Sequence, residues 1–319
     1  VLFRSVVLCD RGSMDNTVYM GFEKFEEKLL QARNTDIVQV RDNRYDAIFH
    51  LVTAADGAEK YYSLENNAVR TESVEEAIEV DRRTQKAWVG HPHLYVIDNS
   101  TDFEGKMSRL VDVICKIVGL PSNLKRRSRK FLLGNLPTDV DNLAAALFPS
   151  DILYQVFDVE KVYLQRSRSS SLTSDNSSNK DYGFIRKRMV IDLKDGKSVL
   201  GTTFQLTTVT MSGGEMIEQK RIISEREYAT AYLSRDPSRH IVKQRRISFL
   251  YKLQSFTIHI YQQPVSASNL AILHAQVEQV EGNGEKEVVL PPFLDVERQL
   301  LSSAEDESKY GAYSISRIE

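Results

Sequence analysis

Short apolar runs alternate with amphipathic segments from the start of the chain to Pro121. The run at 5–9 ends at Asp10-Arg11-Gly12, which is typical of a buried parallel strand that leads into a loop. Ser73, with Glu76 three residues later, forms a capping-box pattern and predicts the start of a helix. The predicted strands cover 5–9, 45–53 and 94–97, and the predicted helices cover 22–33, 73–89 and 103–118. Strands that alternate with helices indicate an α/β unit with a parallel sheet.

Beyond Pro121 the pattern changes to extended segments separated by turn residues. A serine-rich tract, 167–180, lies between two of these segments and is too polar to order itself. The predicted strands cover 129–133, 155–165, 183–193, 198–211, 218–223, 241–250, 255–261 and 270–280, with helices at 140–147 and 225–234. We therefore expect an α/β domain over 1–121 followed by an α+β domain over 122–319.

The composition of the chain limits the kinds of ligand it could bind and the cellular compartment in which we expect it. The formal net charge is only −2, so any binding of polyanions must come from local clustering of the 42 Lys and Arg residues. Cys9 and Cys115 stand in apolar stretches, which predicts buried free thiols in a reducing compartment. Neither a signal peptide nor an apolar run of membrane-spanning length occurs, so we expect a cytoplasmic protein with at most peripheral contact to membranes or vesicles. Because Val1 stands at the edge of an apolar segment, we expect a fragment.

The N-terminal pattern resembles the second half of the small P-loop kinase-like domain of nicotinamide-riboside kinase and NadR-type proteins. The resemblance rests on a strand ending in Asp10-Arg11, the strand YDAIFHL, an arginine-bearing stretch, the strand HLYVIDN and a helix closed by Gly and Pro. It implies that Asp10 and Arg11 lie at a nucleotide, with Asp10 beside its Mg²⁺, and that Asn99 lies in the loop that contacts the base. The implied lid arginines are Arg70, Arg82 and Arg83, although Arg82 and Arg83 could equally form a solvated helix face.

The phosphate-cradling motif G-x-x-x-x-G-K-[ST] does not occur in this sequence. The resemblance places it before Val1. We therefore expect Mg²⁺ and guanine nucleotide to be bound by the full-length protein and to be held poorly by these residues alone.

Basic residues alternate along several strands of the second half. Arg186 and Arg188 share one face of a strand, and Lys243 and Arg245 share one face of another. With Lys130 and Lys220 they could line a water-filled groove, in which Arg offers bidentate contacts to a phosphate and Lys a point charge. The alternative is that these are solvent-facing cations that protect strand edges.

The order RKFLL, FIRKR, KQRRISF and AILHAQVE resembles the CYTH or triphosphate-tunnel family. That family opens with an E-x-E-x-K strand and closes with an E-x-E strand, whose glutamates hold divalent metals. Here the opening positions read Arg126, Ser128 and Lys130, and the closing pair reads Gln276 and Glu278. Because hard cations need several oxygen ligands, this pattern favours binding an anion over hydrolysing it. We place Glu278 in the tunnel with the cations.

A P-loop kinase-like domain followed by a CYTH-like domain resembles the TRPL translocation defect protein fourteen family of animals and their relatives. This resemblance implies a protein that binds guanine nucleotide and acidic phospholipid head groups, with channel or trafficking proteins as partners. An enzyme, either a nucleoside-type kinase or a CYTH-type triphosphatase, is the alternative. Nucleic acid is the least favoured partner, since no nucleic-acid-binding motif occurs. The six histidines lack metal-ligand spacing, and we interpret them as structural.

Overall fold

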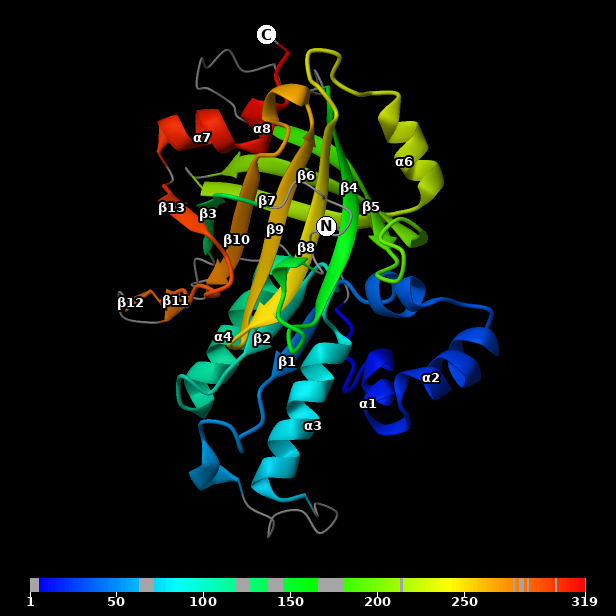
Figure 1. Ribbon diagram of the computed structural model, residues 1–319, viewed down its shortest axis with the longest axis vertical. Coiled ribbons are helices and arrows are strands. Elements are labelled where there is room, and N and C mark those ends of the chain that lie inside the picture. The colour runs from blue at the N-terminus through cyan, green and yellow to red at the C-terminus, as the bar shows by residue number, and fades with distance from the viewer. Residues whose placement is uncertain are drawn as a thin grey trace.

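The computed structural model describes residues 6–62, 72–118, 127–136, 146–165, 181–212, 215–277, 279–280, 284–285, 287–301 and 303–318. These residues form a small parallel sheet with helices, followed by a large antiparallel sheet (Figure 1). Residues 119–126, the serine-rich tract and most of the helix predicted at 140–147 lie outside the described residues. No helix within the described ranges is long and apolar enough to cross a membrane.

The parallel sheet consists of β1 (Ile48–Leu51) and β2 (Leu94–Ile97), paired in register from Ile48 with Leu94 to Leu51 with Ile97. Both strands match their predicted positions. The strand predicted at 5–9 is different, because residues 6–9 form no strand and Val7 and Leu8 are 80% and 72% exposed. Cys9 is accordingly exposed, not buried as predicted, and Cys115 is partly buried. An apolar run becomes a strand only where a neighbouring strand accepts its backbone hydrogen bonds.

Helices cover this sheet as their apolar spacing requires. The longest are α3 (Val74–Ala87) and α4 (Phe103–Val118), which confirm the predicted helices. Ser73 accepts a hydrogen bond from the Glu76 amide while the Glu76 side chain accepts one from the Ser73 amide, so the predicted capping box is present. The predicted helix at 22–33 is present over 22–31, where α2 (Phe22–Phe25) continues directly into a π-helical segment, Glu26–Gln31. A further short helix, α1 (Asn16–Met20), precedes it.

The large sheet has nine antiparallel strands in the order β13-β3-β10-β9-β8-β4-β5-β6-β7. Its strands are β3 (Arg127–Leu133), β4 (Tyr154–Leu164), β5 (Tyr182–Ile191), β6 (Val199–Ser212), β7 (Glu215–Ile223), β8 (Val242–Tyr251), β9 (Gln254–Gln263), β10 (Ala271–Val277) and β13 (Val296–Leu300). A separate pair, β11 (Gln279–Val280) and β12 (Gly284–Glu285), follows β10. The predicted strands of this half are confirmed to within a few residues at their ends.

The sheet is strongly curved, so that β6 and β7 run across the direction of β8–β10 (Figure 1). Its convex side carries the apolar core, in which Ile247, Phe249 and Leu273 pack against Phe148 and Leu294. Helix α6 (Glu225–Tyr232) covers another part of that side, with Tyr228 against Val162 and Ile185. Side chains alternate between the two faces of each strand, so the concave side carries the polar and charged residues, together with two smaller apolar clusters.

The concave side is closed at both ends. At one end lie α7 (Ala304–Tyr310) and α8 (Ala312–Ile315), where Tyr313 of α8 stacks on Tyr182 with ring centroids 4.4 Å apart. At the other end the N-terminal half packs into the sheet through Val38, which contacts Phe157, Val159 and Val190. Gly201 permits this approach, since a Cβ there would lie 2.7 Å from the Val38 side chain.

Candidate anion-binding site

Basic side chains from five strands converge on the concave side of the large sheet. They lie in a continuous cavity of about 2430 Å³ that also extends between the two halves of the chain. We call the part enclosed by the large sheet the cationic cavity and define it by these cations. They are Lys130 of β3, Lys161 of β4, Arg186 of β5, Lys220 of β7 and Arg246 of β8.

The strand register explains why these cations meet. Lys161 lies opposite Arg186 across the β4–β5 ladder, and Arg246 lies opposite His259 across the β8–β9 ladder. Lys130 lies opposite His274 across the β3–β10 ladder. Residues that are opposite in an antiparallel ladder point to the same face. The curvature of the sheet then brings the charges of distant strands toward one another.

Lys243 and Arg245 were predicted to line this cavity, and the structure places them on the other face of β8. Arg245 forms a bidentate ion pair with Asp158, with N–O distances of 2.8 and 2.9 Å, and Lys243 is exposed. Gln244 and Arg246 face the cavity in their place. The sequence contained evidence for this orientation. Ile247 and Phe249 belong to the convex core, and alternation along the strand places Arg245 on the same face as these two residues.

Three of the five cations have no carboxylate within hydrogen-bonding or ion-pair distance among the described residues, although Glu218 attracts Lys161 and Arg186 from farther away. Within the described residues, no carboxylate pairs with Lys161, Arg186 or Arg246. Arg246 donates two hydrogen bonds to Gln244 Oε1, at 2.9 and 2.6 Å, and Arg186 donates one to Gln205 Oε1 at 3.2 Å. Lys161 Nζ lies 4.5 Å from the ring centroid of Phe184, and Arg186 Nε is buried without a hydrogen-bond partner. The cavity therefore contains uncompensated positive charge.

The electrostatic cost of this arrangement appears in the pKa values. Burial, followed by the repulsion of Arg186 and Arg246, holds the pKa of Lys161 well below its usual value. Burial and neighbouring arginines likewise lower the pKa of Arg246. Each like charge disfavours the others, so a bound anion would relieve the repulsion.

Two carboxylates enter the cationic cavity from the described elements. Glu218 of β7 lies 3.2 Å from Lys220, and Glu307 of α7 lies 3.5 Å from Lys130. Burial alone would raise the pKa of Glu218, but Lys220 and Arg186 together hold it below its usual value. Both carboxylates are more than 40% exposed, so they compensate their partners only partly.

The N-terminal half closes the mouth of the cavity with a buried charge cluster. Asp42 lies 2.7 Å from Arg41 and 3.1 Å from Arg188, and Arg188 also donates to the Gly90 carbonyl. Burial alone would raise the pKa of Asp42, but the two arginines hold it below its usual value. Gly90 has φ of 105°, and a Cβ there would lie 3.0 Å from the Arg41 guanidinium. Arg188, predicted as a tunnel residue, is thus occupied by the contact between the two halves.

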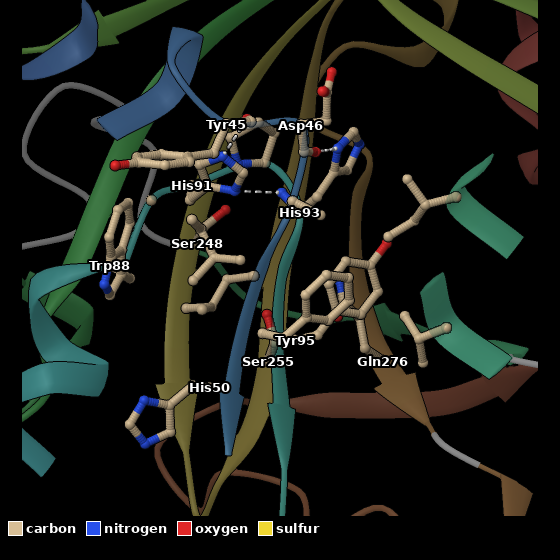
Figure 2. Close-up of a pocket in the computed structure, with 18 of the residues that line it drawn as sticks. Tyr45, Asp46, His50, Trp88, His91, His93, Tyr95, Ser248, Ser255 and Gln276 are labelled. Atoms are coloured by element: carbon tan, nitrogen blue, oxygen red, sulfur yellow. Dashed lines mark hydrogen bonds between the residues drawn. The ribbon is translucent and has the colours of Figure 1, made fainter. Parts of the chain in front are cut away.

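The turn at 91–93 directly follows Gly90 of this cluster, and Figure 2 shows His91 and His93 beside Tyr45 and Asp46. His91 donates from Nε2 to the Tyr45 carbonyl at 3.0 Å and accepts at Nδ1 from the His93 amide at 3.1 Å, so its neutral form is required. Burial lowers the pKa of His91 to about 4 and that of His93 to about 3, the latter helped by Lys220. Neutral rings therefore border the mouth.

The predicted nucleotide residues lie in the N-terminal half, on two different surfaces. Asp10 and Arg11 border the large cavity, and Arg11 adopts φ of 69°. Arg82 and Arg83 are exposed on α3 away from it, with Arg83 3.9 Å from Glu79. The structure thus does not bring these arginines to Asp10. Their position agrees with the alternative that Arg82 and Arg83 form a solvated face of the helix.

Asn99 braces the loop after β1. Its Nδ2 donates to the Thr53 and Asp56 carbonyls, both at 2.7 Å, and its Oδ1 accepts from Lys106. The contact with a nucleotide base stays a prediction. Arg70 and Glu278 lie outside the described residues.

The loop that carries Asp10 is linked by packing to the mouth of the cationic cavity. Asp15 accepts hydrogen bonds from the Gly12 amide at 2.9 Å and from Trp88 Nε1 at 2.7 Å. A Cβ at Gly12 would lie 2.4 Å from the Trp88 ring, so only glycine fits there. Trp88 begins the turn whose Gly90 carbonyl contacts Arg188. A direct chain of contacts therefore connects the two predicted sites.

Sequence reasoning missed several residues of the cationic cavity. Lys161 and Arg246 are absent from the predicted set, and His259 and His274 were interpreted as structural. The rings of His259 and His274 stack with centroids 3.9 Å apart on the cavity wall. Ser128 and Gln276, which the sequence resemblance to the CYTH family would align with metal-binding glutamates, lie opposite each other. Neither side chain is the anionic oxygen ligand that a hard cation prefers.

Comparisons with known proteins identify the N-terminal half only. No curated protein matches the chain. The crystal structure of the hypothetical protein NE1496 aligns with 61% of this chain and 100% of its own, at 16% identity and a TM-score of 0.33. The PH1012 protein from Pyrococcus horikoshii OT3 covers 50% of this chain and 80% of its own, at 12% identity and a TM-score of 0.28.

The Schizosaccharomyces pombe Mediator head module covers 50% of this chain and 86% of its own, at 12% identity and a TM-score of 0.27. The family of AAA domains matches residues 4–106. An AAA domain is a P-loop domain, a class that binds nucleotides. The small parallel sheet of β1 and β2, with its helices, fits such a domain. Residues 4–106 are therefore an AAA-type P-loop domain, followed in the chain by a large antiparallel sheet.

Proposed function

We propose that this chain is a regulatory phosphate-binding protein. In this proposal the cationic cavity holds the phosphorylated head group of an acidic phospholipid, either a phosphoinositide or phosphatidic acid. The AAA-type domain contributes to binding of guanine nucleotide with Mg²⁺. The protein would act in trafficking of membrane proteins such as ion channels, as its resemblance to the TRPL translocation defect protein fourteen family implies.

We base the proposal for the cavity on one observation: Lys161, Arg186 and Arg246 converge on one space, and none of them forms a hydrogen bond or close ion pair with a carboxylate of the described residues. Glu218 attracts Lys161 and Arg186 only from farther away. Buried cations are normally paired, and an unpaired group is costly. An anionic ligand supplies the missing counter-charge. Arginine offers a planar pair of donors to phosphate oxygens, and lysine adds a point charge.

The same residues favour binding over hydrolysis. Metal-assisted cleavage of a phosphoanhydride needs carboxylates that place divalent cations against the phosphate oxygens. The facing positions Ser128 and Gln276 are neutral. The alternative, a triphosphatase, predicts metal-dependent phosphate release from tripolyphosphate by the chain.

Binding to liposomes tests the cavity. The 319-residue chain is mixed with neutral liposomes, with liposomes containing phosphoinositide or phosphatidic acid, and separately with soluble tripolyphosphate. We expect salt-sensitive binding to an acidic lipid that weakens about tenfold or more in Arg186→Gln with Arg246→Gln, since each charged hydrogen bond contributes roughly 1.5–3 kcal/mol.

The matched control is Arg221→Gln with Arg226→Gln, which removes the same charge from exposed positions. Equal loss in both double variants would show that bulk charge, and not the cavity, binds the lipid. Binding of tripolyphosphate without binding of either lipid would point to a soluble ligand. Binding to none of these probes would refute the proposal.

Titration with a fluorescent GTP analogue tests the N-terminal part. Asp10 is exposed at the large cavity and could serve as one oxygen ligand of Mg²⁺. The sequence contains no G-x-x-x-x-G-K-[ST] motif, so we expect weak Mg²⁺-dependent binding that Asp10→Asn reduces further. Tight binding that is insensitive to Asp10→Asn would contradict this assignment.

A further inference from the structure

The cationic cavity contains a pair of imidazoles that the proposed function has not used. His259 of β9 and His274 of β10 point to the concave face on neighbouring strands, and their rings stack 27° from parallel with centroids 3.9 Å apart. Arg246 lies opposite His259 on one side, and Lys130 lies opposite His274 on the other. The pair therefore occupies the wall between two of the cavity's cations.

The His259–His274 pair is surrounded by charged groups from six elements. The groups that face it from the packed elements are Lys130 on β3, Lys161 on β4, Arg186 on β5, Glu218 and Lys220 on β7, Arg246 on β8 and Glu307 on α7. Cations outnumber carboxylates in this set. Burial is the first cause that holds the pKa values of both histidines well below the usual 6.5, and Arg246 and Lys130 add to it. Without a bound anion, these surroundings therefore favour the neutral form of both rings.

We infer that His259 and His274 are binding residues of this cavity and that it takes up a proton on the imidazole pair when it binds a phosphate anion. The inference rests on the proposed function and adds a binding group to it. An anion placed among Lys161, Arg186 and Arg246 offsets the repulsion that keeps the rings neutral. A protonated imidazole then donates to an oxygen of the anion, in a cavity where the neighbouring positions Ser128 and Gln276 carry no charge.

The direction of the pH dependence follows from linkage. The pKa of the pair is higher in the complex than in the free protein, so binding takes up protons and affinity rises as pH falls. Two positive rings 3.9 Å apart would repel each other, so the pair accepts about one proton. The apparent affinity is then expected to rise by up to about tenfold per pH unit on the acidic side of the pKa of the complex.

Trimetaphosphate is a suitable probe, because its strongly acidic groups keep their charge while histidines titrate. Isothermal titration calorimetry of the whole chain in two buffers with different heats of ionisation measures the protons taken up directly. We expect uptake of about one proton for each trimetaphosphate bound near neutral pH. His259→Gln with His274→Gln should still bind through the cations, with uptake and pH dependence both lost.

His240→Gln is the matched control, since His240 is exposed outside the cavity. Chemical shifts of the histidine ring protons in the unmodified chain, with and without trimetaphosphate, report the same protonation without relying on a variant. Uptake that disappears only in the double variant supports the inference. Binding without uptake, or uptake that persists in the double variant, overturns it and leaves the proposed function intact. Absence of binding across about pH 6–8 overturns both.

Discussion

Arg245 and Arg246 are adjacent in the chain and have opposite electrostatic surroundings. Arg245 is buried against Asp158 through two short hydrogen bonds. Arg246 faces Lys161, Arg186 and a neutral amide. The alternation of side chains along β8 separates the two by a single residue. One arginine therefore stabilises the folded sheet, while the other is held at a cost that a ligand would offset.

Substitution of these two arginines should affect stability in opposite directions. In the ligand-free chain, Arg245→Gln should lower the free energy of unfolding by about 1–2 kcal/mol, because Asp158 loses its charged partner. Arg246→Gln should leave it unchanged or raise it by up to about 1 kcal/mol, because repulsion in the cavity falls. Urea denaturation of the two variants measures both effects. If Arg246→Gln lowers the free energy of unfolding as much as Arg245→Gln does, repulsion between the cations does not destabilise the cavity.

At the scale of elements, local signals were sufficient wherever a segment carries its own hydrogen bonds. Helix α4 occupies the predicted residues, and α3 begins with the predicted Ser73 and Glu76 capping box. The residues at 6–9 carry an equally clear apolar pattern and form no strand. A strand depends on a neighbour for its hydrogen bonds, whereas a helix satisfies them internally. The break between α1 and α2 occurs at Gly21, whose φ of 82° interrupts the helical backbone.

At the scale of the whole molecule, the charge cluster of Arg41, Asp42 and Arg188 joins the two halves. Arg188 lies over the ring of Phe157, 3.4 Å from its centroid, and reaches Asp42 and Gly90 across the contact. Val38 packs on the same strands. Through Trp88 and Asp15 this contact is continuous with the Asp10 loop. The chain therefore has a physical connection through which occupancy of one predicted site could affect the other.

Removal of Asp42 should destabilise this contact more than removal of Arg188. Asp42→Asn leaves two buried arginines without a carboxylate and is expected to cost about 3–5 kcal/mol. Arg188→Met keeps the pair of Arg41 with Asp42 and should cost less. Fluorescence of Trp88, the single tryptophan, during urea denaturation reports on this region. Equal costs for the two variants would show that Asp42 is not the centre of the cluster.

The pH dependence of the same contact has a defined sign. The pKa of Asp42 is lower in the folded protein than its usual value of 3.8. The contribution of ionised Asp42 to the free energy of unfolding is therefore complete above about pH 4 and is lost as pH falls through the pKa that Asp42 has in the folded protein. The Asp42→Asn variant should lack this part of the acid transition.

The sequence by itself determined the two-part organisation, most elements and the cationic character of the second half. Each of these depends on patterns within a few residues: periodicity, capping and alternation. Only the tertiary structure decided which cations meet, because the curvature of the sheet and the parity of each strand relative to the core set their positions. Ile247 and Phe249 fix the parity of β8, so Arg246 and not Arg245 enters the cavity. The stacked His259 and His274 likewise come from different strands, and their contact depends on the ladder between β9 and β10.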